Sequence, residues 1–284
     1  MEYDKTIVDR IRDTVVRAGS AFLPDKKNAY ALAIGRETNE QAQWVLSTVL
    51  ENAEIAERNR CPLCDDTGIP HVLVEVGPEA VLTGNTIESI KEGIRRGLRE
   101  LPGRPMAVKG NDAQRIAQSE GLYEDPGMLE PAPILIRSID ENVVRVHILM
   151  FGGGPAIRAR THRVFHKHSV DAVVDQIVEW ATESTAQLGC TPSTLAVGIG
   201  RSHYEAASLM LQALVDGTYD RQSDLEMEIT GRVNESHVGA LGLGGDTTVL
   251  ATFMKVGPQR ASGVRIVCMR PCCCFEPRIA SCSL

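Results

Sequence analysis

The sequence has few aromatic residues, no excess of basic residues and no long hydrophobic run. Phe, Trp and Tyr make up 4% of the 284 residues, so the core must consist mainly of Val, Leu, Ile and Ala. The net charge of −7 argues against general nucleic-acid binding, which needs a basic face to neutralise phosphates. Because no apolar run has the length of a transmembrane helix or a signal-peptide core, we expect a cytoplasmic protein without membrane contact.

Eight cysteines stand out against this ordinary composition. A reducing compartment disfavours a disulfide framework, which leaves metal binding, catalysis or simple burial as explanations. Cys61 and Cys64 flank Pro-Leu in a predicted loop, and Cys190 opens a Thr-Pro loop. Cys268 falls in a predicted strand, where burial alone explains it. The remaining cysteines crowd the C-terminal end of the sequence: Cys272, Cys273, Cys274 and Cys282.

The hydrophobic spacing predicts a mixed α and β protein without regular βαβ alternation. The predicted helices are a first one through Ile7 to Val16 and others over 41–58, 86–98, 169–187 and 203–215. The predicted strands are 71–77, a β-hairpin over 133–151 that turns near 140–142, and 225–233, 247–256 and 264–268. Residues 190–200 are expected to be a loop that runs into a strand and a Gly turn. Thr38, followed by Gln41, is expected to cap the second helix. Residues 99–131 are expected to form loops and a short helix.

Two kinds of metal site fit the cysteine pattern. Cys61 and Cys64 could join a pair from 272–274 in a structural zinc site, although zinc ribbons pair their cysteines over much shorter separations. Alternatively, three thiolates from separate loops could hold a [4Fe–4S] cluster, whose fourth iron then acts as a Lewis acid. A redox role for the CxxC pair lacks its usual βαβ context. Spacing alone leaves the zinc and iron–sulfur sites open.

Five segments in order resemble motifs of the class I fumarate hydratases and two-subunit tartrate dehydratases. They are CDDTG at 64–68, GGG at 152–154, CTPSTLAVGIG at 190–200, GALGLGGDTTVLATF at 239–253 and CFEPRIA at 274–280. The order and rough spacing agree from about residue 40 onward. The resemblance implies an α/β (mixed α+β) fold of the α-subunit type, as a single domain over 1–284. Its helical part would cover 1–60 and its cluster-binding part 61–284.

The resemblance also implies a hydro-lyase with a [4Fe–4S] cluster. Its ligands carry over to Cys64, Cys190 and Cys274, with Cys272 and Cys273 as rivals for the third position. Asp66 matches the family aspartate beside the cluster and is the candidate catalytic residue, although an Asp before Thr-Gly also caps turns. The candidate substrate contacts are Asp65, Gly153, Gly154, Arg158, Arg201 and Arg278.

The resemblance further implies a partner. Single-chain relatives continue into a second domain after the third cysteine motif, so we expect a separate β subunit resembling the fumarase C-terminal domain. A dimer of such heterodimers, acting on a small anionic hydroxy acid, is the expected assembly. The alternative from another class is a non-catalytic iron–sulfur or zinc-binding subunit with a regulatory or structural role.

Several positions depart from the family pattern. Phe151 stands where the family has Lys, and no Arg occurs over 123–130, where a substrate-binding Arg is expected. These changes indicate a different substrate or a loss of hydration chemistry. The basic segment 158–169 could bind an anion as a group, or a metal if His162 and His166 share a helix face. For any single histidine of the segment, a solvated loop or a subunit contact is the favoured interpretation.

Overall fold

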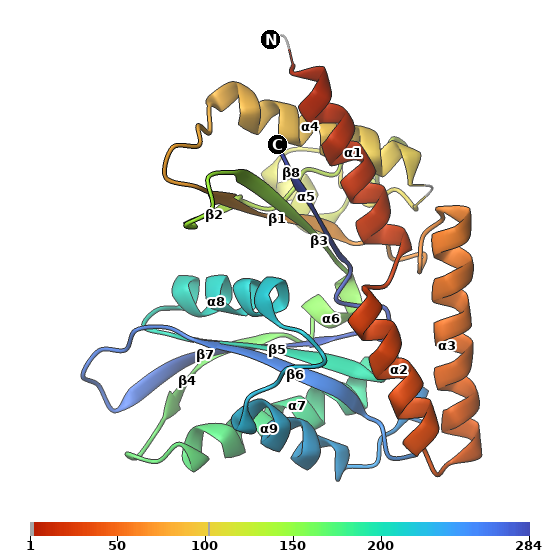
Figure 1. Cartoon of the computed structure of the whole chain (residues 1–284), viewed down its shortest axis with the longest axis vertical. Helices are drawn as coiled ribbons and strands as arrows, with labels where there is room; N and C mark the ends of the chain where they lie inside the picture. Colours follow the sequence, from red (N-terminus) through yellow and green to blue (C-terminus); the bar gives the residue numbers. More distant parts are fainter. Residues whose placement is uncertain (1–2, 102) are drawn as a thin grey trace. The chain divides into compact units, whose positions relative to one another are not determined.

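The computed structural model describes residues 3–101 and 103–284, and its chain divides into two compact units (Figure 1). Unit 1 contains the described residues of Met1–Phe22, together with Ala53–Phe151 and Arg278–Leu284. Unit 2 contains Leu23–Asn52 and Gly152–Pro277. The chain therefore passes between the units repeatedly. The expected single domain over 1–284, with its helical part at 1–60, stays a prediction.

Unit 1 is a four-stranded sheet covered by helices. Its helical segments are α1 (Lys5–Ser20), α4 (Gly84–Glu100), α5 (Asp112–Ala117) and η1 (Pro126–Met128). Its strands are β1 (Ile69–Val76), β2 (Leu135–Ser138), β3 (Val144–Phe151) and β8 (Ile279–Ser283), in the spatial order β2-β1-β3-β8. Alternate residues of β1 and β3, such as Val72 and Ile148, pack against Ile11 of α1 and Ile94 of α4. Because successive side chains of a strand point to opposite faces, these residues share the face of the sheet that packs against the two helices.

The predicted hairpin over 133–151 is wrong. Both segments are strands, but β1 lies between them: β2 pairs with β1 in parallel, and β3 pairs with β1 antiparallel. The hydrophobic pattern identifies each strand correctly and carries no information on which strands become neighbours.

Unit 2 is a second four-stranded sheet, with helices on both faces (Figure 1). Its helical segments are α2 (Pro24–Arg36), α6 (Gly153–Ala156), α7 (Asp171–Leu188), α8 (His203–Asp216), α9 (Asp224–Asn234) and η2 (Ala240–Gly242). Its strands are β4 (Arg160–Phe165), β5 (Ser193–Gly200), β6 (Val249–Val256) and β7 (Val264–Cys272), in the order β4-β7-β5-β6. Every residue of β5 is buried, as expected for a central strand covered on both faces. Helix α3 (Glu40–Asn59) contributes residues to both units.

The helices predicted around 7–16, 41–58, 86–98, 169–187 and 203–215 are confirmed as α1, α3, α4, α7 and α8. The predicted strand over 225–233 is wrong, because this segment is helix α9. Ser223 and Glu226 form a capping box at its start, and this local signal outweighs the β-branched residues that follow. Thr38 does not cap α3, since Asn39 accepts the hydrogen bonds of the first amides while Thr38 binds Asp246.

Within the described ranges, no helix combines the length and the apolar character that crossing a bilayer requires.

Candidate functional site

Antiparallel pairing in unit 2 brings two distant cysteine segments together. Strand β5 begins where β7 ends, with Thr194 opposite Cys272. The residues before β5 therefore lie beside those after β7. The backbone N–H of Cys274 donates a hydrogen bond of 2.7 Å to the carbonyl oxygen of Cys190, and the hydroxyl of Ser193 donates to the carbonyl oxygen of Cys272 at 2.7 Å. Two of the three predicted cluster ligands, Cys190 and Cys274, are thus neighbours in one unit.

The glycine-rich segment after α9 holds the Cys190 loop in place. The hydroxyl of Thr191 donates to the carbonyl oxygen of Gly239 at 2.5 Å and accepts from the N–H of Gly242 at 3.3 Å. The N–H of Leu241 also donates to the carbonyl oxygen of Thr191 at 3.1 Å. Three of the sequence motifs, at 190–200, 239–253 and 274–280, therefore meet at one place in unit 2.

The three consecutive cysteines differ in their surroundings. Cys272 is buried and is the last residue of β7, which extends beyond the predicted strand 264–268. Cys273 is half-buried and Cys274 is buried. Burial raises the pKa of the Cys272 thiol, and a hydrogen bond with Cys273, together with burial, raises the pKa of Cys274. A neighbouring cation or a bound metal favours the thiolate form of a cysteine.

Helix α2, which the hydrophobic spacing did not predict, supplies a cation at this place. Lys26 and Tyr30 are four residues apart, so both lie on one side of the helix. The Tyr30 hydroxyl donates to the carbonyl oxygen of Cys274 at 2.7 Å, and Nζ of Lys26 donates to the carbonyl oxygen of Glu276 at 2.8 Å. Burial lowers the pKa of Lys26 to about 8, while Cys273, Cys274 and Cys272 act in the opposite direction. Lys26 is therefore a buried basic residue in contact with the cysteine segment.

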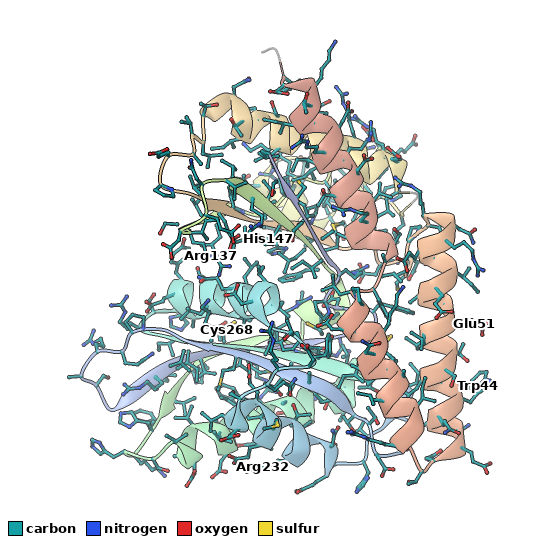
Figure 2. All side chains as sticks on the ribbon, viewed as in Figure 1. Trp44, Glu51, Arg137, His147, Arg232 and Cys268 are labelled. Atoms are coloured by element: carbon teal, nitrogen blue, oxygen red, sulfur yellow. The ribbon has the colours of Figure 1, made fainter. Side chains whose placement is uncertain are left out.

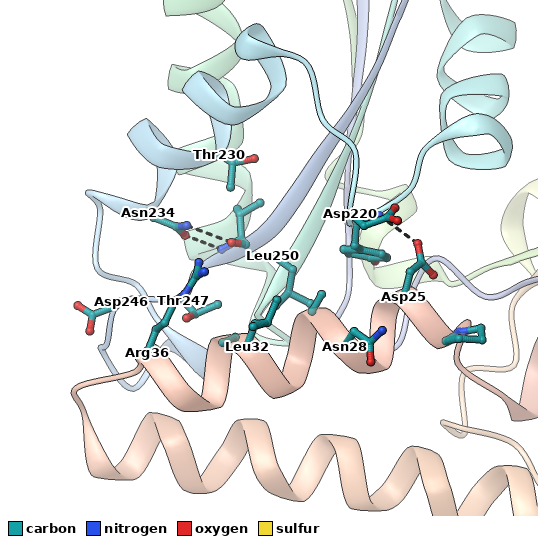
Figure 3. A pocket seen from close by; sticks show the side chains of 15 residues that line it. Asp25, Asn28, Leu32, Arg36, Asp220, Thr230, Asn234, Asp246, Thr247 and Leu250 are labelled. Carbon is teal, nitrogen blue, oxygen red and sulfur yellow. Dashed lines mark hydrogen bonds between the residues drawn. The ribbon is translucent and has the colours of Figure 1, made fainter.

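The start of α2 is fixed by Asp25, whose carboxylate accepts the backbone N–H of Tyr219 at 3.0 Å (Figure 3). Asn28, Leu32 and Arg36 lie along α2 and line a cavity of about 590 Å³ in unit 2. The same helix thus borders this cavity and contacts the cysteine segment through Lys26 and Tyr30.

A buried ion pair follows the cysteines. Nη2 of Arg270 lies 2.8 Å from Oε2 of Glu276, and the other carboxylate oxygen accepts the N–H of Gly152 at 2.5 Å. Burial opposes the charge on Arg270, but the nearby Glu276 carboxylate raises the pKa of the guanidinium overall. The pair fixes the first residue of the GGG motif against the end of the cysteine segment.

The third predicted ligand, Cys64, lies in unit 1. Its thiol donates to Oδ1 of Asp65 at 3.3 Å, and Arg104 pairs with Oδ2 of the same carboxylate at 3.3 Å. The Cys64 hydrogen bond, followed by the Arg104 charge, lowers the pKa of Asp65 below its ordinary value. Arg104 was not predicted, since it lies in the segment 99–131 that was expected to be loop.

Arg278 supports the same loop of unit 1. Its side chain is 1% exposed, and Nη1 donates to the carbonyl oxygen of Asp66 at 2.5 Å. Gly68 has φ of +88°, and a Cβ there would lie 2.7 Å from the carbonyl carbon of Phe151 and 2.8 Å from Nη2 of Arg278. The predicted residues Cys64, Asp65, Asp66 and Arg278 therefore belong to one local arrangement.

The remaining predicted contacts lie in unit 2. Gly153 and Gly154 open the short helix α6, and Arg158 donates to the carbonyl oxygens of Gly154 at 3.0 Å and Gln187 at 2.7 Å. Arg201 precedes α8 and pairs with Glu205 at 2.6 Å. Its guanidinium is thus engaged at the start of α8, at the opposite end of β5 from Cys190.

His162 and His166 do not share a helix face, so the helical metal pair considered for them does not form. His162 lies in strand β4, and His166 follows that strand, with its ring bonded to the carbonyl oxygen of Ser262 at 2.7 Å. These two residues therefore do not form an i,i+4 pair on a helix face.

Unit 1 also has a charged cluster on its sheet, where Figure 2 shows Arg137 and His147. Glu75 of β1 lies opposite Arg137 of β2 and Arg145 of β3. Its carboxylate is 2.5 Å from Arg137, 3.0 Å from Arg145 and 3.2 Å from Nε2 of His147. Nδ1 of His147 lies 2.7 Å from the hydroxyl of Ser281.

In the described part of the chain, no group of three or more His, Cys, Asp or Glu side chains is arranged to hold a single metal ion. The ligands of a four-iron cluster bind different irons and need not converge on one point. The donor set of unit 2, two adjacent cysteine segments beside a buried lysine, suits a thiolate-bound cluster chemically.

The comparisons with known proteins agree with the sequence motifs. The family model described as "Fumarate hydratase (Fumerase)" matches residues 8–282. "Putative L(+)-tartrate dehydratase subunit alpha" of Methanocaldococcus jannaschii is 31% identical over 278 residues, which cover 91% of this chain and 94% of that protein. The Escherichia coli L(+)-tartrate dehydratase subunit alpha is 23% identical, covering 83% and 77%. "Putative fumarate hydratase class I" of Geobacillus stearothermophilus is 24% identical, covering 86% of this chain but 48% of that protein.

Proposed function

The chain belongs to the fumarate hydratase family, and we propose that it is the α subunit of a hydro-lyase whose [4Fe–4S] cluster is held by Cys64, Cys190 and Cys274. The enzyme is a carbon–oxygen lyase of the fumarate hydratase and tartrate dehydratase type. Its reaction is the reversible removal of water from a small anionic hydroxy acid.

One observation carries the proposed cofactor. The hydrogen bond from the Cys274 N–H to the Cys190 carbonyl joins two motifs that are 84 positions apart in the sequence. Burial without a ligand would not require both segments to place their cysteines next to one another beside a buried lysine. Binding of one cluster by the thiolates of both Cys190 and Cys274 explains why the two segments lie together. Cys272, whose side chain is fully buried at the end of β7, is a weaker candidate for the third ligand than Cys274.

The residues around the cluster have separate proposed tasks. When bound, the cluster supplies an open iron that acts as a Lewis acid toward the substrate hydroxyl. Asp66 accepts or donates the proton that the reaction moves, and Arg278 holds the Asp66 backbone in position through its carbonyl oxygen. Asp65 hydrogen-bonds to the substrate and is oriented by Arg104.

The remaining contacts concern the charge of the substrate. Backbone N–H groups of Gly153 and Gly154 are proposed to bind an oxyanion, and Arg158 stabilises this turn through the Gly154 carbonyl. Arg158 is the proposed cationic contact. The other predicted arginine, Arg201, lies at the opposite end of β5 from Cys190 and pairs with Glu205, so it is not part of this proposal. Because Phe151 replaces the family lysine and 123–130 lacks an arginine, we infer that the substrate differs from fumarate or tartrate in at least one anionic group.

A β subunit completes the proposed enzyme. Two of the relatives are named as α subunits, and the fumarate hydratase relative is about twice as long as the matching region. We propose a β subunit that resembles the fumarase C-terminal domain, a dimer of heterodimers, and a cytoplasmic location where the cysteines stay reduced.

The test uses the chain purified without oxygen, alone and with its β subunit, and two matched cysteine variants. Cys190→Ser removes a ligand of the proposed cluster, whereas Cys61→Ser removes a ligand that only a zinc site needs. We expect Cys190→Ser to lose iron, sulfide and the broad visible absorption, while Cys61→Ser keeps all three. Iron and acid-labile sulfide are measured chemically, and zinc by mass spectrometry.

The opposite result identifies the alternative. The purified chain would then contain tightly bound zinc and no iron, and the zinc would be lost in Cys61→Ser and kept in Cys190→Ser. This result would identify the chain as a zinc-binding regulatory or structural subunit rather than part of a hydro-lyase. A cluster present in every ligand-intact preparation, with no hydration or dehydration of any hydroxy acid in the αβ complex, would leave a non-catalytic iron–sulfur subunit.

A further inference from the structure

We propose that Lys26 of α2 is the counter-charge of the cluster: its ammonium stabilises the thiolate ligands of unit 2 and raises the reduction potential of the bound group. This inference rests on the proposed cofactor and extends it to a helix that none of the cysteine motifs includes. Lys26 is thus a positioning and electrostatic residue, and it does not contact the reacting atoms.

The side chain of Lys26 is 1% exposed. Such burial is rare for a lysine, because removing an ammonium from water is unfavourable unless other groups compensate it. Its Nζ donates to the carbonyl oxygen of Glu276, two residues after Cys274. Tyr30, one turn further along α2, donates to the carbonyl oxygen of Cys274 itself. Helix α2 therefore binds the cysteine segment at two points.

Charged side chains lie near the cysteine segment, among them Lys26, Arg270 and Glu276. The Glu276 carboxylate lies 2.8 Å from Arg270. Together these three groups carry a net positive charge beside Cys272, Cys273 and Cys274. An oxidised four-iron core together with three thiolate ligands carries a net negative charge. A bound cluster therefore balances the net positive charge of these three side chains.

The positive charge of Lys26 is expected to affect the reduction of the bound cluster. A reduced cluster carries one more negative charge than the oxidised form, and a nearby cation in a poorly hydrated place stabilises it most. Removing the ammonium should therefore lower the midpoint potential as well as the affinity for the cluster. Conversely, a residue that only packs against the cysteine segment would leave the potential unchanged.

The experiment compares Lys26→Met, Tyr30→Phe and Lys27→Met with the wild-type chain. Lys26→Met keeps the length of the side chain but removes its charge. Tyr30→Phe removes the hydrogen bond to Cys274 without changing charge. Lys27→Met removes one positive charge from the next position of the same helix and serves as the matched control. Each protein is loaded with iron and sulfide under anaerobic conditions, and the midpoint potential is measured by redox titration monitored by electron paramagnetic resonance.

We expect Lys26→Met to bind the cluster about tenfold or more weakly and to have a lower midpoint potential. Tyr30→Phe should load less completely at an unchanged potential, and Lys27→Met should match the wild type in both respects. Circular dichroism and thermal melting of the cluster-free proteins show whether Lys26→Met is folded. If it does not fold, Lys26→Gln, which retains a donor for the Glu276 carbonyl, takes its place.

Two results would overturn the inference in distinguishable ways. A wild-type chain that loads normally, together with a folded Lys26→Met or Lys26→Gln variant of equal affinity and potential, removes the role of Lys26 and leaves the proposed function intact. A wild-type chain that takes up no iron and sulfide removes both.

Discussion

The carboxylate of Glu276 lies 2.8 Å from the guanidinium of Arg270, and the two side chains are 0% and 3% exposed. Removing one partner of a buried pair leaves an uncompensated charge, which typically costs about 3–5 kcal/mol. We therefore expect Arg270→Met to lower the free energy of unfolding by about that amount, as measured by urea denaturation of the cluster-free chain.

Arg232 is the matched control for this change (Figure 2). It pairs with Asp175 at 2.7 Å and with Glu228 at 3.2 Å, but these groups are substantially exposed. Arg232→Met should cost about 0–1 kcal/mol. Equal losses in both variants would contradict the buried pair as a stabilising element of unit 2.

Gly68→Ala tests the backbone of the Cys64 loop. The positive φ, and the short distances that a Cβ would have to Phe151 and Arg278, predict a loss of about 1–3 kcal/mol and a displaced Arg278 side chain. Gly231→Ala is the control, because Gly231 lies in helix α9 with open space around it and should become more stable by about 0.5–1 kcal/mol. Thermal melting of both variants provides the comparison, and a neutral Gly68→Ala would show that the loop adapts.

Unit 1 should lose stability as the pH falls. Burial lowers the pKa of His147, so below its unfolded pKa of about 6.5 the unfolded chain binds the proton more readily than the folded chain. Burial opposes ionisation of Glu75, but its hydrogen bonds with Arg137 and His147 outweigh burial and lower its pKa. Its contribution is therefore present above about pH 4.3 and is lost as the pH falls further.

The measurement is the urea midpoint from pH 8 down to about pH 3, which covers the titration of both His147 and Glu75. We expect a first decline below about pH 6.5 that disappears in His147→Gln, and a second decline at lower pH that persists there. A wild-type midpoint that stays constant from pH 7 to pH 5.5 would argue against a stabilising neutral His147.

Asp66→Asn tests the proposed proton transfer. Loss of a positioned acid or base typically lowers the rate by about 10²–10⁴-fold, so kcat of the αβ complex should fall by that factor with little change in KM. Asp65→Asn, one residue earlier, should chiefly raise KM, since Asp65 is a proposed substrate contact. Steady-state kinetics of the cluster-loaded variants would reject these roles if the two effects were reversed.

The sequence predicted most helices correctly because their apolar residues recur at helical spacing over three or more turns, as in α1 and α4. It missed α2, where the buried positions include Lys26 and Tyr30 rather than an apolar stripe. A lysine that faces a cysteine segment has the same sequence pattern as a solvated lysine. Only the fold distinguishes the two.

The pairing of strands was the other feature that the sequence did not predict. The motifs correctly identified 190–200 and 274–280 as related segments, but their contact depends on the antiparallel register of β5 and β7, which hydrophobic periodicity does not contain. The hairpin error has the same origin. Arg104 and Asp65 likewise pair across 39 positions, a separation that no local signal encodes.

The division of the chain into interleaved units has a consequence for biosynthesis. Unit 2 is complete once residue 277 has emerged from the ribosome, whereas unit 1 still lacks β8 at that moment. Until residues 279–283 have been synthesised, the edge of β3 that pairs with β8 has no partner. An unpaired strand edge of this kind is prone to pair with another strand. Although most of unit 1 is translated first, it is the later of the two to acquire its full set of strands.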